Sequence, residues 1–153
     1  MSKRRSLEEL KTRINELEKE VSKLKEDRNQ VERILSSVET GLSIINPDHT
    51  INWVNDKIRD MFPGEKPIGQ ACHKFYESSE EPCDPCSTFQ CFQTGKSNTI
   101  ERYNPTTEKW YRIISQPVTD NAGNVVSVLE GITEITERKR AEQAILRERE
   151  FLK

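Results

Sequence analysis

Apolar side chains along residues 7–38 recur at the spacing of three and four residues that places them on one side of an α-helix. They form two interleaved series with a period of seven residues, and Arg28 interrupts the first of them. The two series are Leu7, Ile14, Val21 and Leu35, and Leu10, Leu17, Leu24, Val31 and Val38. No proline or glycine precedes Gly41. The pattern predicts a coiled-coil helix over residues 1–38.

A helix of this length leaves its apolar stripe in water unless a second helix covers it. Charged residues beside the stripe favour a parallel partner, because Arg13 of one helix faces Glu18 of the other. In the same way Glu20 faces Lys25. We therefore expect a parallel homodimer. Its predicted seam consists of Leu10, Ile14, Leu17, Val21, Leu24 and Val31.

The helical spacing stops at Gly41, and short apolar runs separated by turn residues follow. The runs at 42–45 and 50–54 flank a turn sequence of Asn, Pro, Asp and His at 46–49. These residue types favour a tight turn, so the segment predicts a β-hairpin. We expect His49, which lies in the turn, to face solvent.

Asn55 follows the hairpin and is expected to cap a short helix that ends near Phe62, because its side chain can accept a free backbone N–H. Later apolar runs predict three more strands, at about 98–103, 109–117 and 125–132. In the last strand, Val126, Val128 and Ile132 lie on one face. The order predicts an α+β fold, in which a five-stranded antiparallel sheet carries short helices on one face.

The composition supports a division of the chain into parts. Hydrophobic residues make up 33% of it and charged residues another 33%, which is too polar for a single globule of 153 residues. We expect a coiled-coil helix at 1–38, a packed domain at 39–136 and a C-terminal helix at 137–153.

The charge and hydropathy patterns also bear on possible partners. A net charge of −2 gives no electrostatic argument for nucleic-acid binding. No apolar run approaches the roughly 18 residues of a membrane span, and the basic start at residues 1–5 leads into charged residues rather than into a signal sequence. We therefore expect a cytoplasmic protein without a nucleic-acid or membrane partner.

All four cysteines lie close together, in the spacing C-x10-C-x2-C-x4-C. In a reducing compartment such a cluster points to metal or redox chemistry more than to structural disulfides. The segment 64–96 that holds them is expected to be irregular, except for a short helix that begins near Ser87. A metal site would order this segment. The candidate ligands are Cys72, Cys83, Cys86 and Cys91, with His73 as a substitute for Cys72.

Three interpretations of the cluster remain open. The first is a metal site that holds zinc or an iron–sulfur cluster through four thiolates. The second is a reversible dithiol switch without a cofactor. In the third, the cysteines are small apolar residues or form disulfides that close the loop.

Three motifs resemble the PAS family of sensory domains. The segment GLSIINPDHTINWVN, which ends at Asn55, is similar to the family's opening hairpin and capped helix. The Ile68–Gly69 pair is similar to the short segment that follows this helix. Residues 132–142, ITEITERKRAE, resemble the junction between the last strand and an output helix, with Glu134 where the family usually has Asp.

The resemblance covers about residues 30–146 and implies signal input, in which a ligand or a redox event shifts the sheet and its flanking helices. Glu134 and Thr136 lie where the last strand becomes the output helix, so we expect them to relay the signal. We expect no enzyme, because no Ser/His/Asp set or carboxylate pair suggests catalysis. The chain would be the sensory part of a histidine kinase or another signalling protein, with a downstream domain or partner protein.

The cysteine cluster is similar to that of oxygen-sensing PAS kinases with a four-cysteine iron–sulfur centre. Those proteins have two C-x2-C pairs, whereas this chain has one, at Cys83 and Cys86. Residues 69–73 stand where flavin-binding light sensors carry Gly-Arg-Asn-Cys-Arg, and only Gly69 and Cys72 match. We therefore expect no flavin.

The sequence favours a signal-transduction sensor that detects a redox, oxygen or metal-linked signal through its four cysteines and relays it through the flanking helices of a dimer. One alternative is a structural dimerisation module with a zinc-pinned loop. Another is a PAS sensor that binds a small organic ligand in its cavity.

Overall fold

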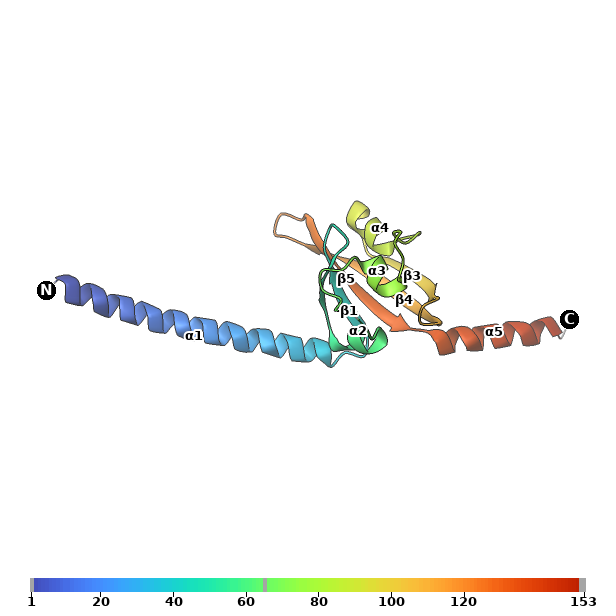
Figure 1. Cartoon of the computed structure of the whole chain (residues 1–153), viewed down its shortest axis with the longest axis horizontal. Helices are drawn as coiled ribbons and strands as arrows, with labels where there is room; N and C mark the ends of the chain where they lie inside the picture. Colours follow the sequence, from blue (N-terminus) through green and yellow to red (C-terminus); the bar gives the residue numbers. More distant parts are fainter. Residues whose placement is uncertain (1, 65, 152–153) are drawn as a thin grey trace. The chain divides into compact units, whose positions relative to one another are not determined.

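The computed structural model describes residues 2–64 and 66–151, and Figure 1 labels the elements. The chain forms two separate units, residues 1–37 and 38–153. No helix in the described part of the chain is both long enough and apolar enough to cross a membrane.

The first unit is a single helix, α1 (Ser2–Ser36). The predicted apolar stripe runs along it and finds no cover within the unit. Its seam residues are all strongly exposed, from 44% at Leu17 to 61% at Leu24. The helix predicted from the heptad spacing is therefore present, and its apolar side chains remain available to a partner.

The second unit is the predicted α+β domain. Its elements in chain order are β1 (Gly41–Ile45), β2 (Ile51–Val54), α2 (Asp56–Met61), α3 (Cys72–Glu77), α4 (Ser87–Thr94), β3 (Asn98–Asn104), β4 (Lys109–Thr119), β5 (Val125–Glu134) and α5 (Thr136–Phe151). All strand pairs are antiparallel, and the strand order is β2-β1-β5-β4-β3. The first and last strands of the chain are thus neighbours at the centre of the sheet, and Gly41 pairs with Ile132.

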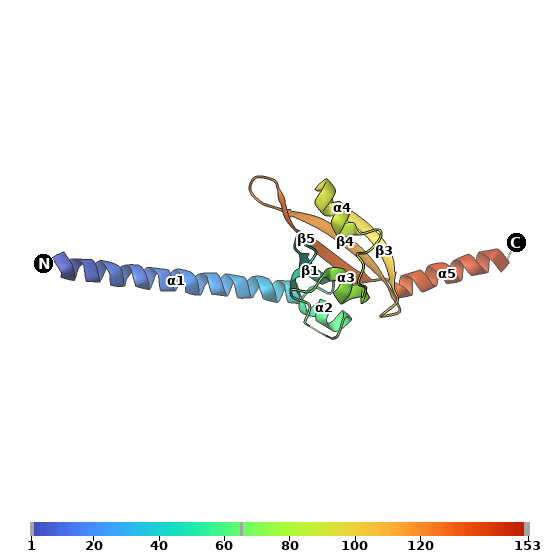
Figure 2. The same cartoon turned by 45° about the horizontal axis from the view of Figure 1, so that its top comes forward.

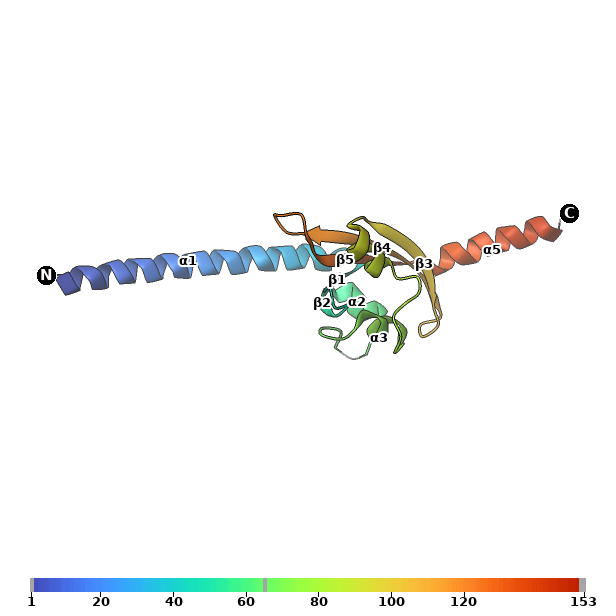
Figure 3. The same cartoon turned by 90° about the horizontal axis from the view of Figure 1, so that it is seen from above.

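Helices α2, α3 and α4 all contribute side chains to one face of this sheet. Figures 2 and 3 show the course of these helices beside the strands. The core on this face combines Ile58 of α2 with Cys72 of α3, Tyr111 of β4 and Ile132 of β5. The alternation of the strands explains the arrangement, because every second side chain points into the core.

Asn55 fixes the start of α2, as the sequence predicted. Its side-chain oxygen accepts the backbone N–H of Ile58 at 3.2 Å and that of Leu42 at 2.9 Å. Its amide nitrogen donates to the carbonyl of Thr40 at 3.0 Å. The residue is only 1% exposed. One buried side chain therefore caps α2 and ties it to the beginning of β1.

The expectation of an irregular segment at 64–96 is wrong in one respect. Besides the helix predicted from Ser87, the segment contains α3, which the sequence did not suggest. Phe75 and Tyr76 of α3 pack against the domain core. Burial of these aromatic side chains holds α3 against the domain core.

The expectation that His49 faces solvent is also wrong. The residue adopts a left-handed conformation with φ 64°, and its side chain is half-buried. Its ring lies 6.3 Å from that of Phe89 and 6.1 Å from that of Phe92, between ring centroids. The hairpin turn therefore packs against α4, and contact with these aromatic rings removes part of the imidazole from solvent.

Candidate functional site

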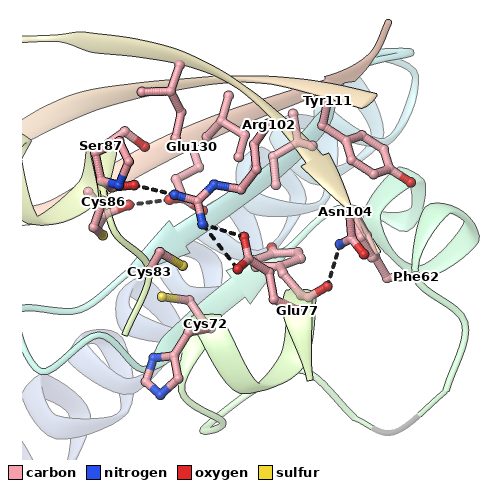
Figure 4. A pocket seen from close by; sticks show the side chains of 17 residues that line it. Phe62, Cys72, Glu77, Cys83, Cys86, Ser87, Arg102, Asn104, Tyr111 and Glu130 are labelled. Atoms are coloured by element: carbon pink, nitrogen blue, oxygen red, sulfur yellow. Dashed lines mark hydrogen bonds and ion pairs between the residues drawn. The ribbon is translucent and has the colours of Figure 1, made fainter. Parts of the chain in front are cut away.

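A cavity of about 50 Å³ lies between the helices and the inner face of the sheet. Figure 4 shows its lining side chains. They include the aromatic rings of Phe62, Tyr76 and Tyr111, three thiols and three further ionisable groups. The thiols belong to Cys72, Cys83 and Cys86, and the other ionisable groups to Glu77, Arg102 and Glu130.

Three of the four predicted cysteines converge on this cavity from different segments. Cys72 is the first residue of α3 and is 7% exposed, while Cys83 lies half-buried in the loop before α4. Cys86 caps α4, where its sulfur accepts the backbone N–H of Phe89 at 3.4 Å. The sulfur atoms of Cys72 and Cys83 point toward one another in Figure 4.

Cys91 is fully buried on α4 and does not belong to the cavity lining. Cys91 follows the N-cap residue Cys86 by five positions along the chain, and of these two cysteines only Cys86 belongs to the cavity lining. The structure therefore does not bring all four cysteines into one site. Among residues 2–64 and 66–151, no three His, Cys, Asp or Glu side chains are grouped to hold a metal ion.

The environment of the thiols favours their neutral form. Burial raises the pKa of Cys72 strongly, and the nearby Glu130 carboxyl adds to the effect. Burial also raises the pKa of Cys83 to about 11, with Glu77 contributing and Arg102 opposing it. Near neutral pH both groups are thiols, and a thiolate forms only when a reaction partner or a bound cation stabilises it.

His73, the substitute ligand considered from the sequence, lines the cavity beside Cys72. It is also electrostatically coupled to His49. Burial first, and then the charge of His73, lower the pKa of His49. His73 is thus placed at the cavity, but it completes no metal-ligand group in the described chain.

A row of polar side chains crosses the inner face of the three central strands. Glu130 of β5 pairs in register with Ser43 of β1 and with Ser115 of β4. The Ser43 hydroxyl donates to Glu130 Oε2 at 3.3 Å, and the Thr88 hydroxyl of α4 donates to Glu130 Oε1. Glu130 is only 6% exposed, and its burial raises the pKa of its carboxyl.

Glu130 was missed from the sequence, although a signal was present. Val128 and Ile132 were placed on one face of the last strand, and Glu130 lies between them with the same parity. A carboxyl at an inward position of a strand is rare unless it is paired or functional. Strand parity alone could therefore have identified it.

Arg102 of β3 ties the cysteine segment to the sheet. Its guanidinium donates to both carboxylate oxygens of Glu77, at 2.8 and 3.1 Å, and to the carbonyl of Pro85 between Cys83 and Cys86. Both charged side chains are only about one-fifth exposed, at 18% and 20%. This ion pair closes one wall of the cavity, as the dashed lines in Figure 4 show.

The predicted relay residues lie at the junction of β5 and α5. The Thr136 hydroxyl accepts the backbone N–H of Trp110 at 3.1 Å, and the Ile135 N–H donates to the Trp110 carbonyl at 2.8 Å. Glu134 pairs with Lys109 at 2.8 Å, and this lysine lowers the pKa of the carboxyl. Both residues therefore connect the junction of β5 and α5 to the start of β4.

A second set of contacts holds the first turn of α5 against β3. Glu101 accepts hydrogen bonds from Arg138 at 2.5 Å and from Lys139 at 2.6 Å. The Lys139 ammonium also lies 5.1 Å from the centroid of the Trp110 ring. These contacts were not expected from the sequence, because Glu101 and Lys139 lie far apart along the chain.

The fold and its junctions agree with the sequence model of the PAS domain, which matches residues 39–137, more than half of the chain. The chain belongs to the PAS family. PAS domains are sensory modules that do not themselves catalyse reactions, and they commonly dimerise and pass signals to downstream domains. No curated protein sequence matched the chain.

Solved structures share the fold at low sequence identity. An RNA-binding light-oxygen-voltage receptor aligns with a TM-score of 0.65 and 15% identity, over 81% of this chain and 37% of the receptor chain. The chain thus spans little more than a third of that receptor. The PAS domain of a Colwellia psychrerythraea protein has a TM-score of 0.58 and 14% identity, over 71% of this chain and 97% of that one.

The PAS domain of Bordetella pertussis BvgS aligns with a TM-score of 0.55 and 12% identity, over 81% of this chain and 96% of that domain. These likenesses concern the fold alone. The absence of flavin therefore stays a prediction from the sequence at residues 69–73.

Proposed function

We propose that the chain is the input module of a signalling protein, in which oxidation of the cavity thiols is the signal and α5 is the output. The observation that carries this proposal is the convergence of Cys72, Cys83 and Cys86 on a cavity whose floor includes β5. The same strand runs into the junction with α5. In this proposal a change at the thiols is passed to β5 through side-chain packing across the cavity, and β5 continues into α5.

The proposed chemical step is a reversible disulfide between Cys72 and Cys83. The two thiols lose two protons and two electrons and form one S–S bond, while a disulfide oxidant such as oxidised glutathione becomes two thiols. Their raised pKa values make the reaction slow without activation, so the switch would respond to sustained oxidation.

The residues present do not fit a four-thiolate zinc or iron–sulfur centre, because Cys91 lies outside the cavity lining. Packing of α3 against the core supports this choice, because it fixes part of the segment that a zinc ion was expected to hold. We therefore derive no step through a metal. A dimer joined by the exposed stripe of α1 remains part of the proposal, since each helix needs cover for its apolar side chains.

The test is to oxidise the full chain with oxidised glutathione and to map the disulfide by mass spectrometry after thiol alkylation. Spin labels on α5 would report the distance between the two output helices. We expect a Cys72–Cys83 disulfide and a changed distance, both lost in Cys83→Ser and both retained in Cys91→Ser. A disulfide without any change in distance would refute the relay, and metal bound by anaerobically purified protein would refute the dithiol chemistry.

A further inference from the structure

The floor of the cavity contains a buried acid without a cationic partner. Glu130 accepts hydrogen bonds from the hydroxyls of Ser43 and Thr88. No Lys, Arg or His within residues 2–64 and 66–151 forms an ion pair with it. A buried carboxyl in this situation stays protonated unless a cation reaches it, and its raised pKa agrees with that.

A second polar group in the cavity also lacks a partner. The Tyr76 hydroxyl is buried and makes no hydrogen bond within the described chain. Burial is the largest cause of the raised pKa of Tyr76, and a weak side-chain contact with the Ser43 hydroxyl, outside the geometry of a well-formed hydrogen bond, opposes it. The Glu130 carboxyl is near enough to raise the same pKa. An unsatisfied buried hydroxyl beside an unpaired acid points to a polar ligand atom between them.

Aromatic rings form the adjoining wall. The ring centroid of Phe62 lies 5.0 Å from that of Tyr76 and 5.2 Å from that of Tyr111. All three side chains line the cavity. Aromatic faces attract cations, and the attraction is stronger when the cation is removed from water. The aromatic rings and the Glu130 carboxyl therefore both favour a positively charged ligand.

The one arginine of the cavity lining does not reverse this preference. Arg102 is already neutralised by Glu77 at 2.8 Å and also donates to Pro85. An anionic ligand would have to displace Glu77 and would then face Glu130. The cavity is thus unfavourable for anions and suited to a cation.

The size of the cavity limits the ligand. A volume of about 50 Å³ compares with roughly 10–15 Å³ for one water molecule on the same measure. Three to five non-hydrogen atoms therefore fit. The polar partners require hydrogen-bond donors, which a primary ammonium supplies and a quaternary one does not.

We propose that this cavity binds a small primary amine, whose ammonium group donates to Glu130 and to the Tyr76 oxygen while its alkyl part contacts Phe62 and Tyr111. The inference deepens the proposed input role of the cavity and rests on it. It adds a ligand class that Glu130 and Tyr76 would recognise, whereas the proposed thiol chemistry involves Cys72 and Cys83 of the same cavity.

The experiment is an NMR titration of the full chain, in which the methyl groups of Ile113 and Ile132 report on the cavity that they line. The probes are propylammonium chloride, 1-propanol and sodium propionate, with sodium chloride at matched ionic strength. They have similar size and differ in charge. We expect saturable binding of propylammonium at least tenfold tighter than that of either other probe.

Glu130→Gln keeps the shape and hydrogen-bonding capacity of the side chain and should weaken propylammonium binding at least tenfold. Tyr76→Phe should weaken it several-fold, and the exposed control Glu108→Gln should leave it unchanged. Equal binding of 1-propanol, unchanged binding in Glu130→Gln or no saturable binding by the parent would each overturn the proposal. None of these results depends on α5, whose distance change tests the input role separately.

Discussion

Helix α1 and the PAS domain differ in how far their apolar side chains are exposed to solvent. In α1 the seam side chains are 44–61% exposed, whereas Ile45, Ile51 and Ile58 of the domain are fully buried. The domain buries its hydrophobic residues within its own core, whereas the apolar stripe of α1 stays uncovered within its unit, as expected for a helix that associates with another. Association and folding should therefore respond to different substitutions.

The largest expected effect is on association. Leu17→Lys combined with Leu24→Lys would place four like charges in the seam of a parallel dimer, and each buried unpaired charge costs several kcal/mol. We expect a monomer by analytical ultracentrifugation, with an intact domain. The matched control is Thr12→Lys with Ser22→Lys, on the outer side of the predicted heptad. A dimeric seam variant would show that another surface holds the chains together.

A substitution in the core of the domain should have the opposite effect, a loss of stability without a loss of association. Ile58 is fully buried in α2, and Ile58→Ala should reduce the free energy of unfolding by about 2–5 kcal/mol. Urea denaturation measures this loss, while sedimentation should still show a dimer. Ile68→Ala is the control, because Ile68 is 50% exposed and its truncation should cost less than about 0.5 kcal/mol. A dimer lost together with the core would mean that the two units are not independent.

Within the domain, the buried carboxyl of Glu130 should make the free energy of unfolding depend on pH. Burial raises the pKa of Glu130, so the folded state holds this proton more tightly than the unfolded state does. The contribution of Glu130 to the free energy of unfolding is complete when the pH lies below the pKa of this group in the unfolded chain. It declines as the pH rises from there through the higher pKa of the folded state. The unfolding free energy of Glu130→Gln should therefore fall less than that of the parent as pH rises above about 4.3. Parallel pH profiles would mean that Glu130 is not desolvated in solution.

The smallest effect is expected at the output junction. Glu101→Gln would weaken the contacts with Arg138 and Lys139, which are partly exposed and therefore contribute little to stability. Hydrogen exchange in the first turn of α5 should become faster, while the core strands keep their protection. The control Glu148→Gln lies further along α5 and should change neither rate. An unchanged exchange rate in Glu101→Gln would show that these contacts do not stabilise the first turn of α5 and take no part in the proposed relay.

Local patterns identified much of this architecture. The helix α1 and the five strands follow from spacing along the chain, and Asn55 follows from its capping chemistry. Helix α3 could not be predicted in this way, because its six residues are ordered by Phe75 and Tyr76 packing against distant strands. Tertiary contacts of this kind leave no periodic signal in so short a segment.

The candidate site shows the same limit. Spacing grouped the four cysteines, but only the fold reveals that Cys91 lies a helical turn away from the cavity thiols. Arg102 and Glu77 are 25 residues apart, so their ion pair also depends on the sheet. Only Glu130 could have been found from strand parity.

The pairing of β1 with β5 has a mechanical consequence. The two strands are antiparallel neighbours, and Gly41 at the start of β1 pairs with Ile132 near the end of β5. The chain therefore enters and leaves the domain at the same end of one strand pair. Tension applied through the two flanking segments first loads the contacts of Thr40 with Asn55 and of Thr136 with Trp110. It then acts on the Gly41–Ile132 end of the ladder, which would open one hydrogen bond at a time. Such an unzipping geometry yields to smaller forces than one in which all the bonds are sheared together, so a small pull suffices to separate the central strands.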